Sequence, residues 1–134
     1  ATSTSVSGWH DSFAAALFEA AVQAIAEDTP VLLVAYDTES TGPLATVAPS
    51  SIPFGTAMVV SAGSAGGRSL RLRLQAPSGN SKPPVLAEAF AELASRNPMA
   101  AGALPLLAAL ASDASASLLL PAGAHSMLLV ELSA

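Results

Sequence analysis

Three adjacent residues near the start of the chain have the side-chain types that serine hydrolases use. His10, Asp11 and Ser12 offer a base, a carboxylate and a hydroxyl nucleophile. Adjacent residues point in different directions, however, whereas the members of a catalytic triad converge from separate elements. The chain also lacks the Gly-x-Ser-x-Gly motif that places a hydrolase serine on a sharp turn. The pattern therefore predicts the start of a helix, with Asp11 or Ser12 as its cap.

Metal and thiol chemistry have little support in this sequence. His10 and His125 are the two histidines, and neither is accompanied by further ligands at the spacing of a metal site. The chain has no Cys, which excludes disulfides, thiolate ligands and a cysteine nucleophile within these 134 residues. We therefore expect no metal and no cofactor.

A glycine-rich segment at residues 63–67 is similar in composition to a phosphate-binding loop. It joins one expected strand to another strand, and no Lys follows it, whereas phosphate loops lead into a helix. The segment therefore predicts a hairpin turn. Close behind it come three arginines, of which Arg71 and Arg73 share one face of a strand. They could form a small basic spot that suits an acidic carrier protein, or simply a solvated strand face.

The small residues 4–8 (TSVSG) lead directly into an apolar helix. The N-terminus of such a helix can activate a nucleophile or hold an oxyanion through its dipole. Ser5 and Ser7 are the serines of this segment, and neither has a recognisable base beside it. A capped core helix is the simpler interpretation.

The helix expected at residues 9–27 must position this region. It lacks Gly and Pro and is rich in strong helix formers. Because it is apolar on nearly every side, we expect it to be buried between other elements, with Leu17 and Ile25 in the core. Its polar residues form one narrow stripe: Glu19, Gln23 and Glu27.

The expected strands follow this helix. Residues 31–36 (VLLVAY) form a continuous apolar run, which is typical of a strand buried on both faces in a parallel or mixed sheet. Residues 56–61 predict a second apolar strand. Residues 68–76 alternate between Leu and polar side chains, which predicts a half-exposed strand, antiparallel to its predecessor through the glycine turn. A long loop at residues 37–53 separates the first two strands.

The remaining segments predict mainly helices and a final hairpin. They are a polar linker at 77–84, an amphipathic helix at 85–96, a short helix at 103–111 with Pro105 in its first turn, and strands at 117–120 and 126–132 around a turn at 121–123. We expect one α/β domain over residues 1–134, with a mixed sheet and a buried central helix.

Composition limits the possible partners. Hydrophobic residues make up 51% of the chain and charged residues 11%, so disorder is not expected. The net charge of −5 repels phosphate and argues against nucleic-acid binding. The longest charge-free stretch, residues 40–67, contains several prolines and cannot form a membrane-spanning helix. No signal peptide is evident, so we expect a cytoplasmic location. The low charge predicts a chain that buries surface against a partner.

The run SVSGWHDSFAAALFEAAVQ, then PVLLVAYD, a proline-rich loop and FGTAMVVS resembles the β-ketoacyl synthase N-terminal-like family. The ending LLLPAGAHSMLLVELSA fits it as well. These are thiolase-fold proteins related to chain-length factors of fatty acid, polyketide and aryl polyene pathways. The resemblance implies a thiolase-like partial domain and an additional section before the residues that correspond to Ala1.

In catalytic ketoacyl synthases, the helix that resembles residues 9–27 begins at the nucleophilic Cys. The corresponding stretch within residues 4–8 has no Cys, and neither histidine matches a catalytic motif of that family. The resemblance therefore implies a non-catalytic, chain-length-factor-like subunit. Its expected partners are a catalytic synthase or a second copy of itself, together with acyl carrier protein. Two alternatives remain: a fragment of a catalytic 3-oxoacyl-acyl-carrier-protein synthase, and an interaction module without acyl chemistry.

The resemblance also implies site residues. Ser7, Gly8, Trp9 and Phe13 are candidates to line an acyl pocket beside the active site of a partner. Arg71 and Arg73 are candidates to contact the carrier protein. No catalytic residue is assigned.

Overall fold

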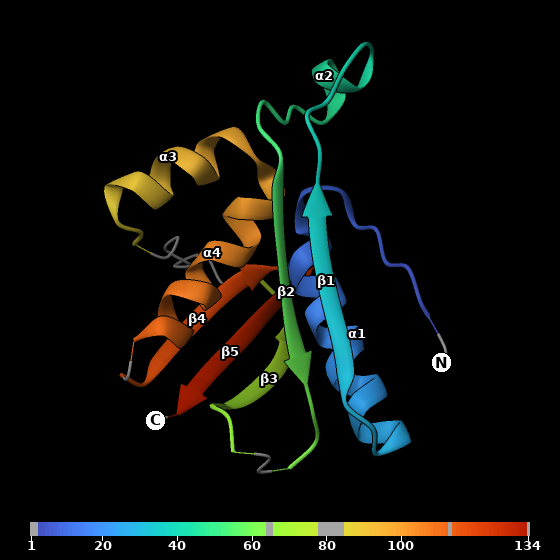
Figure 1. The fold of residues 1–134 in the computed structure, drawn as a ribbon, viewed down its shortest axis with the longest axis vertical. Helices are drawn as coiled ribbons and strands as arrows, with labels where there is room; N and C mark the ends of the chain where they lie inside the picture. Colours follow the sequence, from blue (N-terminus) through green and yellow to red (C-terminus); the bar gives the residue numbers. More distant parts are fainter. Residues whose placement is uncertain (1–2, 64–65, 78–84, 113, 134) are drawn as a thin grey trace.

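The computed structural model describes residues 3–63, 66–77, 85–112 and 114–133 (Figure 1). Its helical elements are a 3₁₀ turn η1 (Trp9–Asp11), α1 (Ser12–Glu27), α2 (Leu44–Val47), α3 (Glu88–Arg96) and α4 (Pro98–Ala111). Its strands are β1 (Val31–Asp37), β2 (Phe54–Val60), β3 (Ser69–Gln75), β4 (Ala116–Pro121) and β5 (Met127–Ser133). Within these residues, no helix is long and apolar enough to cross a membrane.

The predicted helix at 9–27 is confirmed as η1 followed by α1. Phe13, Ala14 and Leu17 of α1 are at most 1% exposed, so this helix forms the centre of the core. The prediction that Ile25 belongs to the core is wrong, because its side chain is 70% exposed. The last turn of α1 extends past the elements that cover its middle, and an apolar residue there contacts solvent.

Strands β1 and β2 form a two-stranded antiparallel sheet, called sheet A below. The register runs from Val31 opposite Val60 to Asp37 opposite Phe54. Leu33 of β1 packs in the core. The prediction that this strand is buried on both faces is wrong, because the alternate side chains of β1 are exposed. A continuous apolar run has the same composition whether one face is covered or both.

Strands β3, β5 and β4, in that order, form a three-stranded antiparallel sheet, called sheet B. The period-two prediction for residues 68–76 is confirmed as far as Arg73: Leu70 and Leu72 pack against the core, while Arg71 and Arg73 are exposed. It fails at Leu74, which is 46% exposed. The C-terminal hairpin is confirmed too. The prediction that β3 pairs with its predecessor is wrong, because β2 pairs with β1 and β3 pairs with β5. All these pairings are antiparallel, so the prediction of a mixed sheet is wrong: the described strands form two separate antiparallel sheets.

Helices α3 and α4 meet at Asn97. Its side-chain oxygen accepts a hydrogen bond from the backbone N–H of Ala100 at 3.0 Å and caps α4. Pro98 then stands at the first position of the helix, where its missing N–H has no cost. Therefore α4 begins before the predicted residue 103, and Pro105 lies inside the helix instead of in its first turn. Of the predicted linker at 77–84, residues 78–84 lie outside the described residues.

The core lies where α1 and α4 meet the inner faces of both sheets. Its buried side chains come from α1, β1, α4, β4 and β5, and α1 contacts α4 as well as strands of both sheets. Gly102 allows this approach, since a Cβ at that position would lie 3.1 Å from the Cβ of Phe13. The prediction of an α/β fold with a buried central helix is confirmed.

Candidate functional site at the start of helix α1

The four acyl-pocket candidates lie in different surroundings. Ser7 is exposed, Gly8 is half-buried and Trp9 is 67% exposed, whereas Phe13 is 1% exposed and belongs to the core. None of the four lines the cavity that opens beside the start of α1. The described structure therefore places three of them on a turn at the surface and the fourth beneath it.

That turn is held by the hydroxyl of Ser12. The backbone N–H of Gly8 donates to Ser12 Oγ at 2.8 Å, and Ser12 Oγ donates to the carbonyl of Trp9 at 2.7 Å. Ser12 is 9% exposed, so this hydroxyl is both buried and engaged. It cannot serve as a free nucleophile beside His10, which agrees with the rejection of a His-Asp-Ser triad.

Trp9 has an unusual backbone conformation. Its φ is +54°, in the left-handed region that bulky side chains rarely adopt. Such a conformation costs about 1–2 kcal/mol, which the surrounding hydrogen bonds must offset. The result is a sharp turn that leads into a buried helix and presents a large aromatic side chain to solvent.

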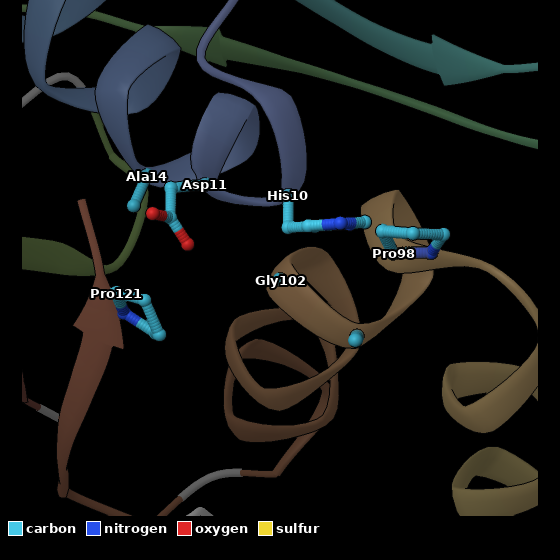
Figure 2. A pocket seen from close by; sticks show the side chains of 7 residues that line it. His10, Asp11, Ala14, Pro98, Gly102 and Pro121 are labelled. Atoms are coloured by element: carbon cyan, nitrogen blue, oxygen red, sulfur yellow. The ribbon is translucent and has the colours of Figure 1, made fainter. Parts of the chain in front are cut away.

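A cavity of about 330 Å³ lies next to this turn. Its walls come from η1, α1, α4 and β4, and Figure 2 shows the carboxylate of Asp11 pointing into the space between α1, α4 and β4. The imidazole of His10 extends towards Pro98. The lining residues are His10, Asp11, Ala14, Pro98, Ala101, Gly102 and Pro121.

This cavity has mainly apolar walls, with the polar side chains of His10 and Asp11 at one side. Its volume is near the lower end of the range for small-molecule pockets. Its lining residues include no Ser, Thr, Lys or Cys, and its two ionisable groups are the imidazole of His10 and the carboxylate of Asp11. No cluster of metal-ligating side chains occurs within the described part of the chain.

The three clustered arginines differ in their contacts. Arg68 donates to the carbonyl of Ser133 at 3.1 Å, to that of Ala114 at 2.6 Å and to that of Ser112, so its guanidinium ties three chain segments together. Arg71 lies 3.9 Å from the carboxylate of Glu131 at an exposed position. The prediction that Arg71 and Arg73 share an exposed strand face is confirmed, and their contact with a carrier protein stays a prediction.

A family model described as "Beta-ketoacyl synthase, N-terminal domain" matches residues 1–126. The chain belongs to the β-ketoacyl synthase N-terminal domain family. No curated protein and no solved structure gives a significant match. The α/β architecture with a buried central helix is consistent with a partial thiolase-like domain of this family.

Two features of this candidate site were not predicted from the sequence. The first is the left-handed turn at Trp9. A positive φ at this position is predicted neither by a Trp nor by the residues next to it. The second is the contribution of α4, since Ala101 and Gly102 reach the cavity from a helix that begins earlier than predicted. Gly102 was the available signal: a glycine inside an apolar helix often marks a close approach of another element.

Proposed function

We propose that this chain is a non-catalytic, chain-length-factor-like subunit of a fatty acid, polyketide or aryl polyene synthase. It would pair with a catalytic ketoacyl synthase in the cytoplasm and receive substrates on acyl carrier protein. Membership of the β-ketoacyl synthase family supports the general acyl chemistry.

The observation that carries this proposal is the turn before α1. In catalytic synthases that resemble this chain, the corresponding helix begins at a nucleophilic Cys. Here the sharp turn before the helix holds Trp9 in a left-handed conformation, and the nearby Ser12 hydroxyl is engaged on both sides. A Trp side chain cannot form a thioester, so Trp9 would contribute shape but no covalent intermediate.

The proposed contribution is to an acyl pocket at an interface. Trp9 and the neighbouring Ser7 and Gly8 are exposed or half-buried and could contact a partner directly. Phe13 is buried in the first turn of α1, where Gly102 of α4 approaches its side chain closely. The apolar wall of the adjacent cavity suits the hydrocarbon part of an acyl chain.

Arg71 and Arg73 are the proposed contacts of the carrier protein. Both are exposed on sheet B, and the carrier proteins expected for this family are acidic. Because Arg71 also lies near Glu131, Arg73 would make the larger contribution to binding.

The test is incubation with acyl carrier protein charged with a labelled acyl group, followed by mass spectrometry of the intact chain. The expected result is no acyl adduct. Ser7→Ala and Ser5→Ala variants provide the matched comparison, with Ser117→Ala on sheet B as the control. A stoichiometric adduct that is lost in Ser5→Ala or Ser7→Ala would contradict the proposal and favour a catalytic chain.

A further inference from the structure

Asp11 stands at a helix cap but does not act as one. It occupies the N-cap position of α1, where Asp is favoured because its carboxylate can accept backbone N–H bonds. The side chain of Asp11 forms no such bond. Its carboxylate points instead into the cavity between α1, α4 and β4 (Figure 2). The turn before α1 is held by the hydroxyl of Ser12, so the orientation of Asp11 is not explained by the turn.

The carboxylate of Asp11 has no cationic partner in the described part of the chain. Neither of the ion pairs between described residues includes it. The other polar side chain of the cavity, His10, extends towards Pro98. Asp11 is half-buried, so its carboxylate has lost part of its contact with water without gaining a charged neighbour. A cationic donor from outside the chain would satisfy it best.

The remaining walls of the cavity are apolar. They are formed by residues without a polar side-chain atom: Ala14, Pro98, Ala101, Gly102 and Pro121. A ligand would therefore find polar side chains at one side and hydrocarbon elsewhere. The volume of about 330 Å³ suits a compact molecule.

The first turn of α4, which also borders the cavity, gives little support to an anion. A helix N-terminus attracts anions through its unpaired N–H groups. Pro98 has no N–H, and the N–H groups of Ala100 and Ala101 both donate to Asn97. The net charge of −5 also attracts cations and repels anions. Charge therefore favours a cationic ligand.

An organic cation fits this cavity better than a metal ion does. Within the described residues, no group of three or more side chains could hold a metal. Hard metal ions take six or more oxygen ligands and gain nothing from apolar walls, whereas an organic cation can bury its hydrocarbon part against them.

We infer that this cavity binds a small organic cation. Its ammonium group donates to the carboxylate of Asp11, and its apolar body lies against α4 and β4. The inference goes beyond the proposed function and does not depend on it. An acyl chain would use the same apolar walls, but its binding would not require the carboxylate.

The experiment is a nuclear magnetic resonance titration of the full 134-residue chain with hexylamine, 1-hexanol and hexanoate. These probes have the same hydrocarbon length and differ in charge. Ligands of this size bind weakly, so each is added to about 10 mM. Hexylamine should shift the backbone signals of η1 and of the first turn of α4. It should bind at least about tenfold more tightly than hexanol, and hexanoate should bind most weakly.

Asp11→Asn tests the carboxylate, and Asp28→Asn at the other end of α1 is its matched control. Asn is as good a cap as Asp, and it tolerates the left-handed φ of +48° at Asp28, so both variants should keep the thermal unfolding midpoint. Only Asp11→Asn should lower the affinity for hexylamine, by about tenfold, to that of hexanol.

Ala101→Leu tests the cavity, and Ala111→Leu at the other end of α4 is its matched control. Both alanines are exposed, so neither change should disturb the core. Only Ala101→Leu should abolish binding of hexylamine, because its side chain fills the space beside Asp11. Equal binding of the three probes would overturn the inference and leave the acyl proposal standing. No binding of hexylamine, or binding unchanged by Asp11→Asn or by Ala101→Leu, would overturn it too.

Discussion

The two sheets pack on the same helices but differ on their outer faces. On sheet B, Arg71 lies beside Glu131, and Arg73 lies opposite Leu129, so charged and apolar side chains are mixed. On sheet A, the outer face is apolar throughout. The outer face of sheet B is therefore suited to contact with water, whereas both faces of sheet A are suited to burial. The uncharged surface of this chain is therefore gathered on the outer face of sheet A, while sheet B carries charged side chains.

The largest expected effect is the loss of stability when a core leucine is truncated. It tests whether the inner faces of the two sheets contribute equally to the core. Leu128 of sheet B is 0% exposed and Leu33 of sheet A is 8% exposed, and both belong to one core cluster. Leu128→Ala and Leu33→Ala should each lower the free energy of unfolding by about 2–5 kcal/mol. Urea denaturation monitored by circular dichroism measures both. A loss below 1 kcal/mol for Leu33→Ala alone would show that sheet A is only loosely attached to the core.

The next effect concerns the loop that connects β1 to β2. Asn97 is 1% exposed, and its Nδ2 donates to Ser50 Oγ at 2.9 Å and to the Ile52 carbonyl at 2.8 Å. Asn97→Ala removes these bonds and the cap of α4, so it should cost about 2–3 kcal/mol. Ser51→Ala is the neighbouring control, because the Ser51 hydroxyl is exposed. Equal midpoints for Asn97→Ala and Ser51→Ala in thermal unfolding would refute this role.

A smaller effect is expected at the corresponding anchor of sheet B. Arg68 donates to backbone carbonyls that follow α4, precede β4 and end β5. These bonds are exposed, so Arg68→Ala should cost only about 1 kcal/mol in urea denaturation. Arg68→Lys keeps the charge but loses the fork of donors, and should recover less than half of this loss. Full recovery by Lys would mean that charge, not the fork, anchors the sheet.

The smallest effect is expected on the outer face of sheet B. Arg71 and Glu131 are 3.9 Å apart with side chains 77% and 45% exposed. Such a pair contributes about 0–1 kcal/mol and is screened by salt. Arg71→Ala should therefore change the unfolding midpoint slightly in low salt and not measurably in high salt. A large loss that persists in high salt would show that this face is less solvated than its composition suggests.

Local patterns predicted the elements better than their partners. Helix α1 and the alternation of β3 follow from residue type and period, since both depend on neighbours within a few positions. Residue type and period do not predict that β1 pairs with β2 or that β3 pairs with β5. An apolar strand can form its backbone hydrogen bonds with any other strand. The glycine turn favoured a local hairpin, but the chain crosses from one sheet to the other there.

The candidate site was predicted only in part. The sequence predicted a site at the start of an apolar helix, and a cavity does open beside that helix start, but its lining residues include none of the four acyl-pocket candidates. The surroundings of individual side chains were not predicted, because they depend on elements distant in sequence. Phe13 lies in the core since Gly102 of α4 packs on it. Trp9 is itself the left-handed residue of the turn before α1, and it is 67% exposed.

The pairing of β3 with β5 has a consequence for the order in which the chain folds. Asp37 pairs with Phe54, whereas Gln75 pairs with Met127, so sheet B closes a much longer loop than sheet A. The longer closure costs about 1 kcal/mol more in chain entropy. Strand β5 is also synthesised after β3, so β3 stays unpaired until β5 has been made. During that interval α1 and sheet A can form, but the core that they share with sheet B stays open.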